Sequence, residues 1–248
     1  MAPYVTLFTS SPDTPATASM AKRTLSSSVK RREATLQNSS QLVTLFAGNG
    51  AEKFVVHKDF ACHYSPVFQA AFSSQFVEGQ TQEYRLKDTT AEAIRLLVNW
   101  FYTQKVEVRQ LGPEGNFSTK EVNMKFKHHE DITLVELWVL ADKLLLPRLQ
   151  NTIVEEMQRL REQLRLAPIN CYALAYEKTQ EGSPLRRFLV DSSVGSSMQK
   201  PEFYECIEQF PKEMLMDMFI VGKAALPSAA RKALRPEKGM AKYKVPEE

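Results

Sequence analysis

The sequence predicts an α+β fold that combines a few short strands with many helices. Segments rich in β-branched and aromatic residues occur at 42–47 and 53–57, and in 83–86 the apolar Tyr84 and Leu86 alternate with charged residues. Between and after them, apolar residues recur every three or four positions, which is the period of a helix with one buried face. The chain has 248 residues, enough for one domain with additional segments.

The first two strands are predicted to form a hairpin. Residues 42–47 are followed by Gly48-Asn49-Gly50, a strong signal for a tight turn. The second strand then begins, and Phe54 and Val56 fall on one of its faces.

From Asp59 the apolar spacing becomes helical. Pro66 interrupts this pattern, because a proline inside a helix removes one backbone hydrogen bond and clashes with the preceding turn. We therefore expect a kink or a break into two short helices near Ser65. A polar loop over 73–81 is expected before the strand at 83–86. The predicted helical stripe consists of Ala61, Tyr64, Phe68, Ala71 and Phe72.

Two later helices are each predicted to begin with a capping box, in which a threonine hydroxyl and a glutamate carboxylate satisfy free amides at the helix start. Thr89 and Glu92 form the first pair, and Thr133 and Glu136 form the second. The buried stripe of the first helix is Ile94, Leu97, Val98 and Phe101. That of the second is Leu134, Leu137, Trp138, Ala141, Leu144 and Leu145.

Glycine, proline and charged residues between 109 and 130 predict a long exposed insertion. Pro147 suits the first turn of a further helix, where its missing amide would be unpaired anyway. The stripe of that helix is Leu149, Ile153, Met157 and Leu160. Residues 161–222 are predicted to form short helices that pack on the preceding ones.

The basic residues are concentrated at the two ends of the chain. Residues 1–40 carry five basic and two acidic side chains, and residues 223–248 carry seven and three. Since the whole chain is +3, residues 41–222 have a net charge of −4. We expect both ends to be disordered tails and direct nucleic-acid binding to be absent, because the charge does not lie on a structured face. Alternatively, Lys22-Arg23 with Lys30-Arg31-Arg32 directs nuclear import.

No pattern for catalysis, a cofactor or a metal site is found, and we expect neither an enzyme nor a small-molecule substrate. Nucleophile-elbow, P-loop and dinucleotide motifs are missing, and the three cysteines are widely spaced. His57 and His63 flank a strand–helix junction beside Cys62, and a hydrogen-bonded histidine is favoured over a metal ligand. Several acidic residues are expected on solvated helix faces: Glu155, Glu156, Glu202, Glu205 and Glu208.

The chain is expected to reside in the cytoplasm, the nucleus or both. No apolar run approaches the roughly 20 residues that span a membrane. The first residues lack the basic and apolar regions of a secretory signal. The methionines Met214, Met216 and Met218 are predicted to fill a core, with a flexible binding groove as the alternative.

Several separated motifs resemble the BTB/POZ family, in the order in which that family has them. These are His57-Lys58-Asp59-Phe60, Ser65-Pro66-Val67-Phe68 with Phe72, Trp100-Phe101-Tyr102-Thr103, and Leu140-Ala141-Asp142-Lys143. The resemblance covers a domain over 41–160, with Thr103-Gln104 where the family usually has Thr-Gly. Residues 170–190 are similar to the corresponding part of BTB proteins from filamentous fungi.

The resemblance implies a three-stranded sheet covered by helices, and a function in protein association. Family members self-associate or bind protein partners, and some act as substrate adaptors that bind a cullin scaffold in ubiquitin ligases. The cullin-binding members carry a hydrophobic-x-Glu element, and Phe76-Val77-Glu78 stands at that position. Either Phe76 is exposed as an anchor for a partner, or it folds back as a lid over the domain's own core. Ser40-Gln41-Leu42 lacks the Asp that often precedes the first strand in dimeric animal members.

Overall fold

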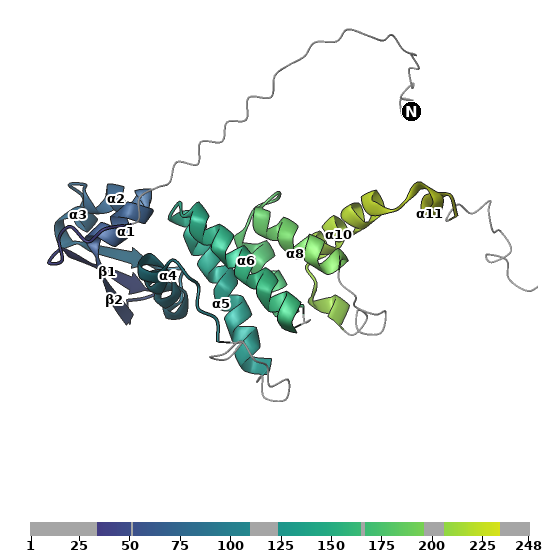
Figure 1. Cartoon of the computed structure of the whole chain (residues 1–248), viewed down its shortest axis with the longest axis horizontal. Coiled ribbons are helices and arrows are strands. Elements are labelled where there is room, and N and C mark those ends of the chain that lie inside the picture. Colours follow the sequence, from purple (N-terminus) through teal and green to yellow (C-terminus); the bar gives the residue numbers. More distant parts are fainter. Residues whose placement is uncertain (1–33, 51, 110–123, 165–166, 196–205, 234–248) are drawn as a thin grey trace, which may run out of the picture. The chain divides into compact units, whose positions relative to one another are not determined.

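The computed structural model of the chain describes residues 34–50, 52–109, 124–164, 167–195 and 206–233, without the side chains of 124–128. Most of the two predicted tails and the middle of the predicted insertion lie outside these residues. The sheet and the helices around it make up one end of the described chain, and a set of longer helices follows (Figure 1).

The sheet is mixed and has the strand order β2-β1-β3. Strands β1 (Leu42–Ala47) and β2 (Glu52–His57) pair antiparallel, and β3 (Glu83–Leu86) pairs parallel with β1. The predicted hairpin is confirmed: Gly48 and Gly50 have φ angles of +49° and +87°, which glycine adopts readily. The amide of Gly50 donates to the carbonyl of Ala47 at 2.8 Å and closes the turn.

The two faces of the sheet differ in character. Val43, Leu45 and Val56 point to the helices and are buried. On the other face, Leu42 and Val55 are exposed, next to the half-buried Thr44 and Phe46. The alternation of strand side chains thus gives the sheet one core face and one free face.

The predicted break at Pro66 is confirmed. Helix α1 (Lys58–Tyr64) ends and helix α2 (Pro66–Phe72) begins on either side of Ser65. The hydroxyl of Ser65 accepts the amide of Phe68 at 3.2 Å and donates to the carbonyl of Leu144 at 2.8 Å. Ser65 therefore caps α2 and also ties it to a segment 79 residues away.

The segment predicted as a polar loop contains a short helix, α3 (Val77–Thr81). Gln82 ends it in the left-handed region, at φ 56°. Its side-chain amide donates to the carbonyls of Phe72 and Gly79, which compensates for a backbone conformation that non-glycine residues rarely adopt.

Helix α4 (Ala91–Thr103) buries Ile94, Leu97 and Phe101 of the predicted stripe. The predicted capping box was wrong by one residue, because the cap is Thr90, whose hydroxyl accepts the amide of Ala93. The helix ends at Gln104, which takes the left-handed conformation at φ 55° where the family usually has glycine. The side-chain amide of Gln104 donates to the carbonyl of Trp100 at 2.8 Å.

Helix α5 (Met124–Lys143) starts inside the segment predicted as an insertion. The capping box at Thr133 was therefore wrong: this residue lies within the helix, and its hydroxyl donates to the carbonyl of His129. Glu136 instead accepts a hydrogen bond from Thr90. Glu130, also in the predicted insertion, is buried and accepts the amide of Arg109 at 2.7 Å.

Helix α6 (Pro147–Leu164) begins at Pro147 as predicted, and its whole predicted stripe is buried. It runs beside α5 (Figure 1). In the connection, Leu145 has φ 55° and an exposed side chain, so its assignment to the buried stripe was wrong. The tight turn that reverses the chain requires a left-handed residue there, which points the Leu145 side chain to solvent.

The C-terminal segment packs on the preceding helices, as predicted. A 3₁₀ turn (Ile169–Cys171) and helix α7 (Tyr172–Lys178) contact α5, and α8 (Pro184–Val194) contacts α7. A second 3₁₀ turn (Ile207–Gln209) precedes α10 (Lys212–Ala225), which packs on α8 and is followed by α11 (Ser228–Ala233). Residues 223–225 and 228–233 are thus helical, whereas the sequence predicts a disordered tail from 223 onward.

Candidate functional site

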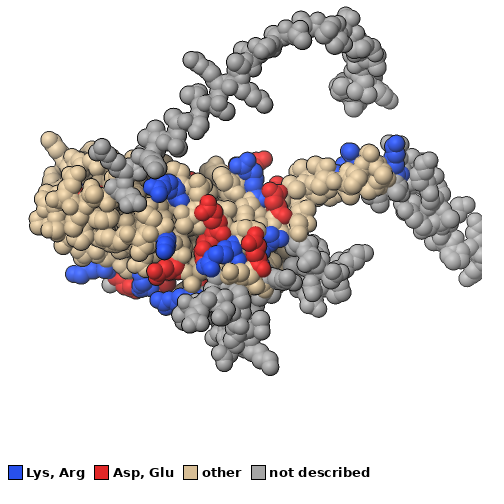
Figure 2. Space-filling view, viewed as in Figure 1, with Lys and Arg blue, Asp and Glu red and all other residues tan. Residues whose placement is uncertain are grey.

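The most exposed of the large apolar side chains in the described residues belongs to the corner between α2 and α3. Phe76 is 77% exposed and Val77 is 62% exposed. The alternative in which Phe76 folds back as a lid was wrong. On the face shown in Figure 2, charged side chains gather over α5–α8, whereas the surface over α1–α3 is mostly uncharged.

Local hydrogen bonds hold this corner in one conformation. The hydroxyl of Ser74 donates to the carbonyl of Ala71 at 2.7 Å and accepts the amide of Phe76 at 3.2 Å. The carbonyl of Phe76 accepts the amides of Gly79 and Gln80 at 3.0 and 3.1 Å. The backbone on both sides of Phe76 is therefore fixed while its side chain remains in solvent.

Gly79 is required by close packing in the same corner. A Cβ atom at this position would lie 1.9 Å from the carbonyl oxygen of Ser74. Real Cβ atoms do not approach oxygen this closely, so any side chain would force the loop and α3 apart. The glycine that follows Glu78 thus allows α3 to fold back against the end of α2.

Glu78 lies in the first turn of α3, where a carboxylate interacts favourably with the helix dipole. It is half-buried, and Tyr84 of β3 lies close enough to feel its charge. Burial, and secondarily the charge of Glu78, raise the pKa of Tyr84. Phe76, Val77 and Glu78 together present two apolar side chains beside one acidic group on a rigid support.

His57 is hydrogen bonded, as predicted. Its Nδ1 lies 2.9 Å from the hydroxyl of Tyr102, and its backbone amide donates to the same hydroxyl at 3.0 Å. His63 lies edge-on against Tyr64, with ring centroids 4.8 Å apart. In the part of the chain that the structure describes, no group of three His, Cys, Asp or Glu residues could hold a metal ion.

The acidic residues expected on solvated helix faces are described in part. Glu156 forms an ion pair with Arg159 on the same helix, whereas Glu155 is exposed. Glu208 is also exposed, and Glu202 and Glu205 lie outside the described residues. No described helix combines the length and the hydropathy needed to cross a membrane.

The methionines of α10 divide between the two predicted roles. Met214 is completely buried, as a core residue should be. Met216 is 57% exposed, and Phe219 and Ile220 nearby are 67% and 61% exposed. The prediction that these methionines fill a core was therefore right for Met214 and wrong for Met216.

Comparison with known proteins agrees with this architecture. The BTB/POZ domain model matches residues 35–160, and this range includes the sheet, the α2–α3 corner and most of α6. A search of curated proteins returned no match, so the resemblance of residues 170–190 to fungal proteins stays a prediction. The match spans half of the chain and contains each of the motifs that carried the resemblance. The chain therefore belongs to the BTB/POZ domain family.

Proposed function

We propose that this protein is a non-enzymatic adaptor that binds a protein partner through Phe76, Val77 and Glu78. BTB/POZ domains are generally protein–protein interaction modules, which gives the broad function. The observation that supports the site is the exposure of Phe76 and Val77 on a corner fixed by hydrogen bonds.

The energetics favour this corner as a binding anchor. Burial of an exposed Phe or Val side chain is worth about 1.5–3 kcal/mol. The backbone of this corner is already fixed by Ser74 and Gly79. Binding of a partner would therefore cost little free energy for ordering the corner. Aromatic side chains that enter a partner's pocket commonly dominate the binding energy, and Glu78 would add a directional charge contact.

The more specific proposal is that the partner is a cullin and that the protein is a substrate adaptor of a cullin-RING ubiquitin ligase. Its support is the hydrophobic-x-Glu element at the position where cullin-binding members of the family carry it. The structure adds that the element is accessible and is followed by a glycine that the loop requires.

A binding measurement tests the site. Isothermal titration of the full chain against a cullin N-terminal domain should show binding, which Phe76→Ala and Glu78→Lys each weaken by about tenfold or more. Val55→Ala, an exposed apolar residue on the sheet, is the matched control and should bind like the wild type. Unchanged affinity in both variants would contradict the site, and a wild-type chain that binds no cullin would contradict the adaptor role.

Self-association is the second candidate function, and the free face of the sheet favours it. Leu42 and Val55 are exposed there, and Tyr102 is exposed beside His57 at the end of β2. Light scattering of the full chain should give a mass above that of a monomer, which Leu42→Ser with Val55→Ser lowers. A monomer at every concentration would exclude this candidate.

A nuclear regulatory scaffold is the further alternative, and it depends on basic residues outside the described part of the chain. We propose residence in the cytoplasm, the nucleus or both. A fluorescent fusion that lacks residues 1–40 should lose nuclear accumulation if Lys22-Arg23 and Lys30-Arg31-Arg32 direct import. An unchanged distribution would remove this alternative.

A further inference from the structure

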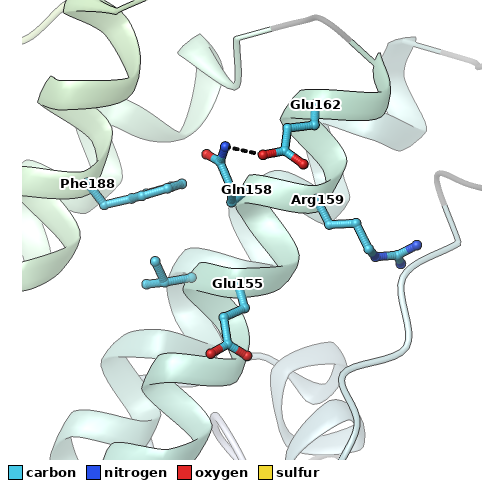
Figure 3. A pocket seen from close by; sticks show the side chains of 6 residues that line it. Glu155, Gln158, Arg159, Glu162 and Phe188 are labelled. Atoms are coloured by element: carbon cyan, nitrogen blue, oxygen red, sulfur yellow. Dashed lines mark hydrogen bonds between the residues drawn. The ribbon is translucent and has the colours of Figure 1, made fainter.

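A groove lies between α6 and α8, two helices that follow the sheet and the α2–α3 corner in the sequence. It has a volume of about 500 Å³, and Val154 of α6 and Phe188 of α8 provide its apolar lining. Figure 3 shows Phe188 pointing from α8 toward α6. A second hollow of about 260 Å³ adjoins it and shares Val154 and Glu155, with Trp138 and Pro184 as further apolar lining. The two shallow hollows lie next to each other on α6, and each combines apolar residues with polar ones.

The rim of this groove is acidic. Glu155 is exposed, and Glu162 accepts a hydrogen bond from Gln158 at 2.7 Å. The one cation in the lining, Arg159, points away from Phe188 in Figure 3 and pairs with Glu156. Among the described residues, neither Glu155 nor Glu162 is in an ion pair, so the groove would accept an apolar segment with basic ends.

Helix α10 presents a surface of the complementary kind. Met216, Phe219 and Ile220 are spaced by three and four residues and therefore form one exposed stripe. Lys212 and Lys223 stand at the two ends of this stripe, one turn beyond its apolar residues, and both are exposed. The described residues contain no ion pair of either lysine, and Nζ of Lys223 lies 5.7 Å from the ring centroid of Phe219.

The opposite side of α10 is fixed to its own chain. Met214 is completely buried, and Asp217 accepts a hydrogen bond from the hydroxyl of Tyr176 at 2.7 Å. The helix packs on α8 through this side. Since this side of α10 is already packed, the stripe of Met216, Phe219 and Ile220 is left on the exposed side of the helix.

We propose that the exposed stripe of α10 binds in the α6–α8 groove of a second copy of this chain. Met216, Phe219 and Ile220 would cover Val154 and Phe188, while Lys212 and Lys223 would approach Glu155 and Glu162. The two surfaces are different, so the contact is heterologous. Two copies can each place the α10 stripe in the groove of the other, or further copies can bind one after another into a longer assembly. This contact is separate from both the Phe76 corner and the free face of the sheet.

Charge reversal with mixing tests the contact on the full-length protein. Sedimentation velocity of the wild type should give a mass that rises with concentration. Lys212→Glu with Lys223→Glu, and separately Glu155→Lys with Glu162→Lys, should each weaken self-association by about tenfold or more. A mixture of the two double variants should associate again, because the acidic α10 of one then meets the basic groove of the other.

Two single variants separate this contact from the other proposals. Phe219→Ser should lower the mass without a change in cullin affinity, whereas Phe76→Ala should leave the mass unchanged. Lys105→Glu, an exposed lysine that belongs to neither surface, serves as the charge control. Failure of the mixture to associate, or a mass that responds to Val55→Ser but not to Phe219→Ser, would overturn the proposal. A wild-type protein that stays monomeric and binds anionic vesicles through the α10 stripe would also overturn the proposal.

Discussion

The hydroxyl of Thr90 donates a hydrogen bond to Oε2 of Glu136 at 2.5 Å, across 46 residues of sequence. Thr90 is the cap of α4, and Glu136 lies in the middle of α5. The same hydroxyl accepts the amide of Ala93. One side chain therefore begins a helix and also joins it to the helix packed beside it.

Substitution of Thr90 should reveal this double role. Thr90→Val removes the cap and the bond to the Glu136 carboxylate, and we expect a loss of about 2–4 kcal/mol in the free energy of unfolding. Thr89→Val is the matched control, because the sequence alone assigned the cap to Thr89. Urea denaturation should show a change within about 0.5 kcal/mol for Thr89→Val, and equal losses in the two variants would contradict the assignment.

Gly79 should be intolerant of even a methyl group. Gly79→Ala places Cβ against the carbonyl oxygen of Ser74, so we expect a loss of about 1–3 kcal/mol in stability and weaker binding of the proposed cullin partner. Gly222→Ala is the control, since a Cβ there meets no atom within 4 Å and should stabilise α10 by up to about 1 kcal/mol. Thermal unfolding measures the stability of both variants, and calorimetric titration measures their binding. A Gly79→Ala variant as stable as the wild type would show that the corner is not tightly packed.

Leu145 should be replaceable by glycine with a gain in stability. Its φ of 55° is unfavourable for a residue with a Cβ, and its exposed side chain contributes little burial. We expect Leu145→Gly to raise the free energy of unfolding by about 0.5 kcal/mol, after the entropy gained by the unfolded chain is included. The neighbouring Leu146 is buried, and Leu146→Gly should cost at least about 3 kcal/mol in the same urea titration.

Two buried tyrosines should make the fold sensitive to alkali. Burial raises the pKa of Tyr172 to about 12, and burial together with the hydrogen bond to Asp217 also raises the pKa of Tyr176. Each folded pKa exceeds the usual tyrosine pKa of about 10, so the unfolded chain loses its protons first and stability falls as pH rises above about 10. Tyr172→Phe and Tyr176→Phe should reduce this slope in unfolding measurements between neutral pH and pH 11. Unchanged slopes in both variants would contradict the raised pKa values.

The periodicity of apolar residues predicted most of the fold. The hairpin at Gly48 and Gly50, the break at Pro66 and the start of α6 at Pro147 all followed from the local chemistry of single residues. Such residues restrict the backbone wherever they occur, so their effect can be recognised without a structure. The position of Phe76-Val77-Glu78 was also known from sequence, through the family resemblance.

Predictions based on pairs of polar residues were wrong more often than those based on glycine, proline and apolar periodicity. Thr133 and Glu136 have the spacing of a capping box, yet they lie within a helix, because Glu136 pairs with Thr90 of another helix. Threonine and glutamate can satisfy local or distant partners equally well, and only packing decides between them. The burial of the apolar run in α10 could not be decided for a related reason, since an apolar stripe has the same spacing whether or not another helix covers it.

The sequence by itself determined the α+β class, the order of the central elements and the membership in an interaction family. These follow from periodicity and from residues that restrict the backbone, which are properties of the chain alone. Only the tertiary structure decided that Phe76 is exposed, that Leu145 faces solvent and that α10 buries Met214 but leaves Phe219 free. The exposure of a side chain depends on which distant elements pack against it, and local sequence does not contain that information.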